Sequence, residues 1–247
     1  MKLRFAVAVF AGCASGGSAG GLPIDGNGPP QQDAKVFEDG RAQLPLDAAI
    51  DAPRVIPPDA RMIDAHPDAC VPVATELLAN PALDLSPQGT SWVEEPIDSS
   101  NPLITTDPSG FAGQSAPYKA FLGGYEAQTF GLSSVTDQMY QDVAVPAGTT
   151  ELVLTGYFVV ATTETTTTTA YDTGSVDLIQ TNGTPIENVM SLSNLTTTPA
   201  AWQAFTYTFA HPSAGQTVRL RLTSTNDVTN NSNFFFDTLS LKATHCH

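Results

Sequence analysis

Residues 217–223 read Thr-Val-Arg-Leu-Arg-Leu-Thr, an unbroken alternation of polar and apolar side chains. Successive side chains of a β-strand point to opposite faces, so the three apolar residues would face one side and the two arginines the other. This alternation is typical of an antiparallel sheet with one face on a core and the other in water. The stretch therefore predicts a half-buried strand.

Working outward from this strand, the sequence contains nine further short runs of β-forming residues, separated by Gly, Pro, Asn and Asp. Asn182-Gly183 between two runs indicates a tight hairpin, and Pro146-Ala147-Gly148 indicates a turn. Helical periodicity is not sustained over three turns anywhere. We therefore expect an all-β chain with a single antiparallel jelly-roll-like β-sandwich. The nine runs are 75–79, 91–95, 118–122, 138–145, 151–161, 175–181, 186–192, 202–209 and 233–242.

The composition narrows the class of protein. The 247 residues include 10 Lys+Arg and 25 Asp+Glu, a formal net charge of -15, which argues against nucleic-acid binding because phosphate contacts need clustered cations. Charged residues make up 14%, below the roughly 25% usual in soluble domains, while Thr, Ser and Gly are abundant. These features favour an extracellular β-rich protein. The sequence has no apolar run near the ~18 residues that a membrane-spanning helix needs.

The N-terminus has the features of a secretory signal. Lys2 and Arg4 precede an apolar run at 5–11, which small residues follow. Phe10-Ala11-Gly12-Cys13 resembles the lipobox of bacterial lipoproteins. The resemblance implies a signal peptide at 1–12, lipid on Cys13, and a lipid-anchored protein of the cell envelope that faces the periplasm or the exterior. The alternative is an ordinary signal peptide that is cleaved elsewhere.

A long acidic segment follows the signal. Between residues 14 and 69 the chain repeats Pro, Asp and Ala and shows no sustained period of either 2 or 3.6 residues. Repeated proline with like charges keeps a chain extended and prevents a core from forming. We expect a disordered Pro/Asp/Ala-rich tether at 13–70 and a β-sandwich domain at 71–247.

The cysteine count suggests one disulfide. If Cys13 carries lipid, Cys70 and Cys246 remain, one just before the predicted domain and one at its end. A secreted chain favours pairing them. The alternative is a metal site at the His-Cys-His sequence 245–247.

Several segments resemble galactose-binding-like carbohydrate-binding modules. They are the Asn-Pro-Ala-Leu-Asp opening at 80–84 with Trp92, the Ser-Ala-Pro-Tyr-Lys-Ala-Phe-Leu-Gly-Gly strand at 115–124, two later strands at 141–148 and 215–222, and Phe-Asp-Thr-Leu-Ser-Leu at 236–241. The resemblance spans nearly all of 76–242. It implies a non-catalytic module, since some members of that family bind sugars and others have no known ligand.

Asp237 is a candidate buried carboxylate. It shares strand parity with Phe235, Leu239 and Leu241, so alternation points it inward. A buried carboxylate needs a partner. The family resemblance implies that Asp84 and Asp237 help to hold a structural Ca²⁺, for which oxygen ligands are suited. The alternative is that backbone N–H groups or a nearby arginine satisfy Asp237.

A sugar site requires an exposed aromatic ring beside polar groups. Tyr140 shares a predicted strand face with Gln138 and Asp142, while the opposite face carries valines. Tyr157 shares a face with Thr155 on another strand. We therefore expect Tyr140, Gln138, Asp142 and Tyr157 to be candidate ligand-binding residues.

The sequence offers little support for catalysis. It contains neither a Gly-x-Ser-x-Gly elbow nor a His-Glu-x-x-His motif, and it lacks a phosphate-binding loop. We expect a surface-anchored, non-enzymatic binding module whose most plausible ligand is a glycan or surface polysaccharide. Two alternatives remain open. One is a structural or protein-contact module without a small ligand, and the other is a hydrolase, which would require two carboxylates facing a common cleft.

Overall fold

The computed structural model describes residues 70–96, 100–106, 111–196, 198–199 and 201–246. The predicted signal peptide, the lipidation site Cys13 and the tether up to residue 69 lie outside the described residues. Within the described part of the chain, no helix has the length and apolar character needed to cross a membrane.

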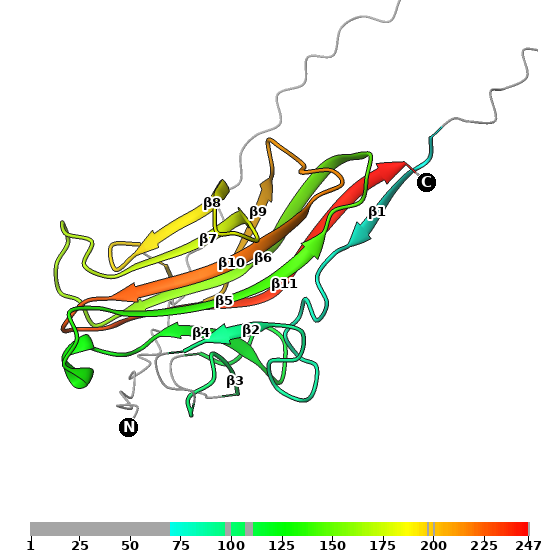
Figure 1. The fold of residues 1–247 in the computed structure, drawn as a ribbon. Coiled ribbons are helices and arrows are strands. Elements are labelled where there is room, and N and C mark those ends of the chain that lie inside the picture. Colours follow the sequence, from blue (N-terminus) through cyan, green and yellow to red (C-terminus); the bar gives the residue numbers. More distant parts are fainter. Residues whose placement is uncertain (1–69, 97–99, 107–110, 197, 200, 247) are drawn as a thin grey trace, which may run out of the picture. The chain divides into compact units, whose positions relative to one another are not determined.

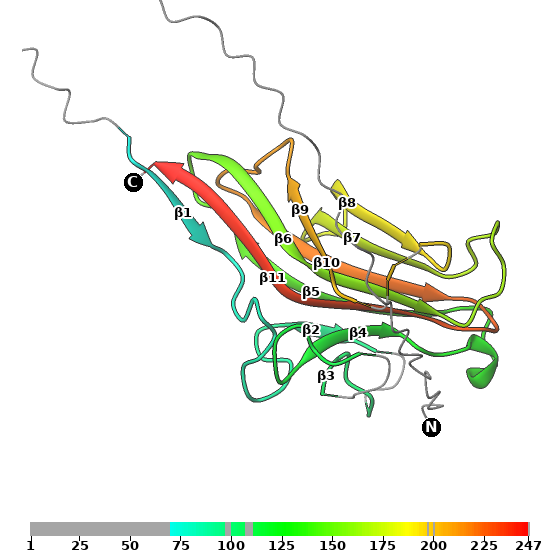
Figure 2. The same cartoon turned by 180° about the vertical axis from the view of Figure 1, so that it is seen from behind.

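Two antiparallel sheets form the fold, and they lie face to face in Figures 1 and 2. The six-stranded sheet has the order β3-β4-β11-β6-β9, with β1 also paired to β11. The five-stranded sheet has the order β2-β5-β10-β7-β8. The elements are β1 (Pro72–Glu76), β2 (Val93–Glu95), β3 (Ile104–Thr105), β4 (Lys119–Gly123), a 3₁₀ turn η1 (Ala127–Phe130), β5 (Val135–Ala144), β6 (Thr149–Thr162), β7 (Thr173–Gln180), β8 (Pro185–Ser193), β9 (Gln203–Thr208), β10 (Thr217–Asn226) and β11 (Ser232–Cys246).

Strand alternation builds the core between the sheets. On β10 the side chains of Val218, Leu220 and Leu222 are fully buried, as the alternation predicts, while Arg219 and Arg221 are only partly covered. The inward residues of β5 and β6 meet them, among them Met139 and Leu154. The prediction of an all-β, jelly-roll-like sandwich is confirmed.

The predicted turns have the expected backbone geometry. β7 and β8 form a hairpin in which Gly183 has φ +92° and donates its N–H to the carbonyl of Gln180 at 2.9 Å. Gly148, between β5 and β6, has φ +75°. Both are left-handed conformations that glycine adopts with little strain.

A disulfide joins the two ends of the described domain. Cys70 and Cys246 are bonded, and the adjacent strands β1 and β11 pair from Pro72 opposite Cys246 to Glu76 opposite Lys242. The predicted pairing is confirmed. Because its sulfur is in the disulfide, Cys246 is not available as the thiolate ligand of a metal site.

Most strand boundaries differ from the prediction by one to four residues, and two differences stand out. β1 covers 72–76 and not 75–79, because the chain leaves the sheet where the Glu76 carboxylate accepts the backbone N–H groups of Leu78 and Leu241. The two-residue strand β3 was not predicted, since so short a strand carries no alternation.

Candidate functional site

The outer surface of the five-stranded sheet carries most of the predicted ligand-binding residues. Met139, Gln141 and Val143 of β5 point inward and are buried, so Gln138, Tyr140 and Asp142 point outward. Cross-strand register places residues of β2, β10 and β7 beside them. Val93 of β2, opposite Tyr140, is an exposed apolar residue of this surface. We call the polar residues of the surface the polar face; they are Glu95 on β2, Gln138, Tyr140 and Asp142 on β5, Arg219, Arg221 and Thr223 on β10, and Ser175 and Asp177 on β7.

Arg219 organises one end of the polar face. Its Nε and Nη2 donate to the two carboxylate oxygens of Asp142 at 2.6 and 3.0 Å, and its guanidinium carbon lies 3.7 Å from the centre of the Tyr140 ring. The hydrogen bond to Arg219 holds the pKa of Asp142 below its ordinary value and raises the pKa of Arg219. One face of the Tyr140 ring is therefore occupied by a guanidinium plane, an attractive cation–π geometry.

Arg221 forms a second pair on the next strand. Its Nη2 lies 3.6 Å from Oδ2 of Asp177. The Asp177 carboxylate accepts a hydrogen bond from Ser175 Oγ at 2.7 Å on Oδ2 and one from Asn188 Nδ2 at 2.8 Å on Oδ1. Nε of Arg221 and Oγ1 of Thr223 are buried and have no hydrogen-bond partner among the described residues. The polar face thus contains two arginine–carboxylate pairs on neighbouring strands.

A shallow depression of about 300 Å³ adjoins these pairs. Five of its seven lining residues carry a hydroxyl group, and no charged side chain takes part. Together with the pairs it offers both donors and acceptors over four adjacent strands. The depression is lined by Thr173, Gly174, Ser175, Ser191, Leu192, Thr223 and Thr225.

The structure does not bring Tyr157 next to Tyr140. Tyr157 is on β6 of the six-stranded sheet, opposite Asp237 on β11 and Ala204 on β9. It shares a side of that sheet with Val159, which belongs to an apolar cluster with Phe235 that is separate from the inter-sheet core. Gln138, Tyr140 and Asp142 lie together, whereas Tyr157 is on the opposite face of the sandwich.

Asp237 is fully buried, but it does not point between the sheets with Leu239 and Leu241. The β11–β6 register shifts between Asp237 and Ser240, and Thr238 has φ +50°. This bulge changes the parity of the strand by one residue. Asp237 therefore shares a face with Phe235, and the prediction of its direction was wrong although its burial is confirmed.

The Asp237 carboxylate is surrounded by hydrogen-bond donors. It accepts the backbone N–H groups of Gln114, Ser115 and Thr238 at 2.6, 3.0 and 2.6 Å, and it lies 3.2 Å from Ser115 Oγ. Burial raises the pKa of Asp237 despite these bonds. This carboxylate holds the segment before β4 against the sheet.

Asp84 also binds the segment before β4, because its Oδ1 accepts the backbone N–H of Tyr118 at 3.0 Å. Asp84 uses one carboxylate oxygen in this bond, whereas both oxygens of Asp237 accept backbone N–H groups, and donor hydrogens repel a cation. The arrangement of Asp237 does not fit a calcium ligand. It fits the alternative that backbone N–H groups satisfy the buried carboxylate.

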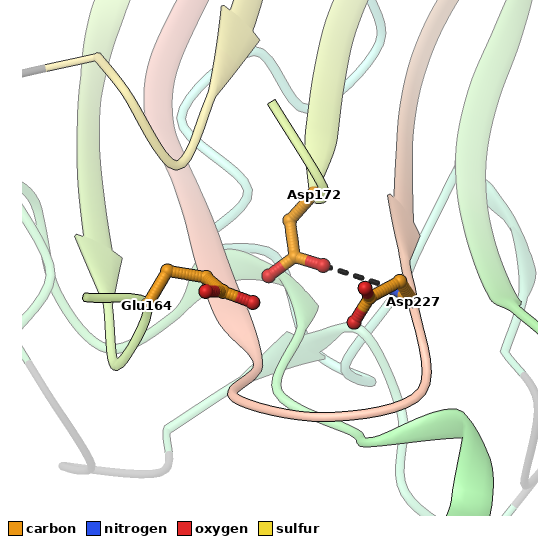
Figure 3. A group of neighbouring side chains, drawn as sticks. All are labelled: Glu164, Asp172 and Asp227. Atoms are coloured by element: carbon orange, nitrogen blue, oxygen red, sulfur yellow. Dashed lines mark hydrogen bonds between the residues drawn. The ribbon is translucent and has the colours of Figure 1, made fainter. Parts of the chain in front are cut away.

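Three other acidic residues converge near the start of β11, the end of that strand away from Cys246 (Figure 3). Glu164 and Asp172 come from the β6–β7 loop and Asp227 from the β10–β11 loop, and their oxygens lie within 4.8 Å of one another. Asp172 is fully buried and accepts the N–H of Asp227 at 2.9 Å and the hydroxyl of Ser232 at 2.7 Å. This cluster could hold a metal ion. The sequence did not indicate it, because Asp227 lies 55 residues after Asp172.

Burial and mutual repulsion disfavour the ionised form of the carboxyl groups in this cluster. Burial raises the pKa of Asp172, and burial together with the charges of Asp172 and Asp227 raises the pKa of Glu164. A carboxyl group with a raised folded-state pKa stabilises the fold below its ordinary pKa, and this contribution falls as the pH rises through the raised value.

We therefore expect Glu164→Gln to raise the melting temperature near neutral pH, with a gap to the wild type that closes toward about pH 4 as the carboxyls become protonated. Glu151→Gln, the same charge change at an exposed position on β6, serves as control. Thermal unfolding across this pH range, with and without CaCl₂, measures the effect. A wild type that calcium stabilises, combined with a destabilising Glu164→Gln, would contradict the expectation and indicate a resident cation.

His211 is exposed in the β9–β10 loop. It lies at an open hollow of about 480 Å³ whose wall includes Pro185, Ile186 and Pro212. A triad histidine must be held by a carboxylate, and no side-chain hydrogen bond or ion pair of His211 is found among the described residues.

No protein-family model matches the sequence, and no curated protein matches it. Among solved structures, the chain is similar to TmCBM61 in complex with β-1,4-galactotriose (14% identity, 68% of this chain, 97% of that chain, TM-score 0.42). It is also similar to the CBM22-1 xylan-binding domain of Paenibacillus barcinonensis Xyn10C (12% identity, 71% and 98%, TM-score 0.39). A third is the K1 cleaved adhesin domain of Lys-gingipain from Porphyromonas gingivalis W83 (11% identity, 72% and 99%, TM-score 0.39).

Two of these three structures are carbohydrate-binding domains by name. The identities and TM-scores are too low for a ligand or a binding site to be carried over from them. The candidate site therefore depends on the residues of this chain alone.

Proposed function

We propose that this protein is a non-catalytic binding module that holds a glycan on the polar face. The single observation that carries the proposal is the arrangement of Tyr140, Arg219 and Asp142, where a ring, a guanidinium and a carboxylate meet on an outward sheet surface. Sugars present apolar ring faces and many hydroxyls. They therefore suit a surface that combines an aromatic ring with paired donors and acceptors.

The adjoining depression supports the same proposal. Its hydroxyl-rich lining extends the hydrogen-bonding surface from β10 to β7 and β8. An oligosaccharide lying across the strands would contact both parts. The opposite outer surface is less suited, because Phe111, Trp202 and the segment bonded to Asp237 cover part of it.

We also propose that the module is presented from a cell envelope by lipid on Cys13 and the acidic segment that follows it. The basic, apolar and small residues at 2–13 support this proposal. The intact mass of the mature protein from its native membrane tests it, since acylation adds the mass of the fatty chains. A mature chain that begins elsewhere and lacks acyl groups would refute it.

The binding proposal predicts different effects for two tyrosines. Tyr140→Ala removes the ring from the polar face, and we expect affinity for a bound glycan to fall by at least tenfold, about 1.4 kcal/mol. Tyr157→Ala removes the same ring from the opposite face, and we expect less than a twofold change. A glycan array followed by titration calorimetry on the full chain measures both.

Equal losses in the two variants would contradict a site on the polar face, and a loss only in Tyr157→Ala would move it to the other sheet. The melting temperatures of both variants should be compared, so that a loss of fold is not taken for a loss of contact. Absence of binding to every glycan on the array would overturn the proposed function.

One observation favours the alternative of a protein-contact module. Phe130, Leu132 and Val228 are each at least 40% exposed. Backbone hydrogen bonds from Gln128 to Val228 and from Leu132 to Ala127 bring their segments together. Exposed apolar residues in one region are typical of interaction surfaces. Glycan binding that survives Phe130→Ser would separate this surface from the polar face.

A further inference from the structure

We infer that the glycan bound on the polar face is uncharged. This inference rests on the proposed function and specifies the class of its ligand. Three observations support it: both arginines are paired with carboxylates of the protein, the depression has no charged lining residue, and the domain has a net negative charge.

The arginines of the polar face are already paired with carboxylates. Arg219 gives Nε and Nη2 to Asp142, and Arg221 lies beside Asp177. A bidentate arginine–carboxylate pair is the same arrangement that a uronic acid would form with a free arginine. A uronate would therefore have to displace Asp142 and leave that carboxylate without its partner.

The remaining groups of the polar face do not attract an anion either. The depression is lined by hydroxyl, glycine and leucine residues, without a cation. Glu95 accepts a hydrogen bond from Gln138 Nε2. Its carboxylate is the third on the polar face, after those of Asp142 and Asp177. The polar face therefore has three carboxylates and two guanidinium groups.

The net negative charge of the whole domain also disfavours an anionic ligand. After residue 70 the sequence has four Lys+Arg and sixteen Asp+Glu, a formal charge of -12. Two of the four cations are Arg219 and Arg221 themselves, and a third, Lys119, is 2% exposed. An anionic polysaccharide would be repelled at long range, by an amount that salt screens.

A neutral glycan has the complementary chemistry. Its hydroxyls can donate to the carboxylates of Asp142 and Asp177 and accept from arginine N–H groups, without breaking either pair. Hydrogen bonds to ionised groups are stronger than those between neutral groups. Paired charges thus serve as strong donors and acceptors that carry almost no net attraction for an ion.

The test uses matched ligands and the full chain. Cello-, manno- and galacto-oligosaccharides are each compared with a form whose primary alcohols are oxidised to carboxylates, beside an array that holds neutral, uronate and sulfated glycans. We expect the wild type to bind a neutral member at least tenfold more tightly than its oxidised form at low salt. The difference should shrink as salt screens the repulsion.

Asp142→Asn sharpens the test, because it frees Arg219 while keeping the shape of the side chain. We expect the preference of this variant for the neutral form to fall by at least fivefold. Glu151→Gln makes the same charge change on the other sheet and should leave the preference within a factor of two.

The outcomes separate the inference from the proposed function. Binding of an oxidised or sulfated glycan as tightly as its neutral form would overturn the inference and leave glycan binding in place. Failure to bind any glycan would overturn both. An unchanged preference in Asp142→Asn would overturn the role assigned to the Arg219–Asp142 pair.

Discussion

Replacing both Cys70 and Cys246 with serine is expected to lower the free energy of unfolding by about 5 kcal/mol. The disulfide joins residues 176 positions apart, so in the chain-entropy model it removes a large amount of freedom from the unfolded chain. Its loss would also release β1, which pairs with no strand other than β11 among the described residues. Urea unfolding of the oxidised wild type and of the double variant measures the difference.

Two controls accompany this prediction. The reduced wild type should unfold at the same denaturant concentration as the double serine variant, because both lack the bond. Hydrogen exchange should show the amides of 73–76 becoming less protected than those of β10. A change below about 1 kcal/mol would contradict the expectation and would mean that the unfolded chain is already compact.

The second large effect is expected for Asp237→Ala. The substitution leaves the backbone N–H groups of Gln114, Ser115 and Thr238 without their acceptor. A buried donor that loses its partner costs about 1–3 kcal/mol, so we expect a total loss of at least about 3 kcal/mol. Chemical unfolding measures it.

Asp142→Ala is the matched control, since it removes the same carboxylate from an exposed pair and should cost less than about 1 kcal/mol. Equal costs for the two variants would refute the structural role of Asp237. Proteolysis within 111–118 should accelerate only in Asp237→Ala, because that segment loses its anchor.

The cost of Asp237→Ala should also depend on pH. Because burial raises the pKa of Asp237, the folded wild type binds this proton more tightly than the unfolded chain does. The carboxyl thus contributes stability that is fully present below its ordinary pKa and is lost as the pH rises through the raised value. The difference in unfolding free energy between wild type and variant should accordingly be larger near pH 4 than near pH 7.

The candidate site was predictable from the sequence only as far as single strands allow. Alternation along the predicted run 138–145 correctly placed Gln138, Tyr140 and Asp142 on one outward face. It could not show that Arg219 of β10 stacks on Tyr140 of β5. That contact depends on the register between the two strands, whose paired residues Arg219 and Asp142 are 77 positions apart in the sequence. Nor could it show that Tyr157 belongs to the other sheet.

The β-character of the chain, its hairpin at Asn182-Gly183 and the two faces of β10 follow from the sequence, because they depend on neighbouring residues and on the two-residue repeat of a strand. The direction of Asp237 and the meeting of the three carboxylates follow only from the folded chain. A one-residue bulge at Thr238 reverses the parity of β11, and the β6–β7 and β10–β11 loops carry Glu164, Asp172 and Asp227 to one place. The physical reason is that side-chain periodicity is local, whereas register, bulges and loop paths are set by the packing of the whole sandwich.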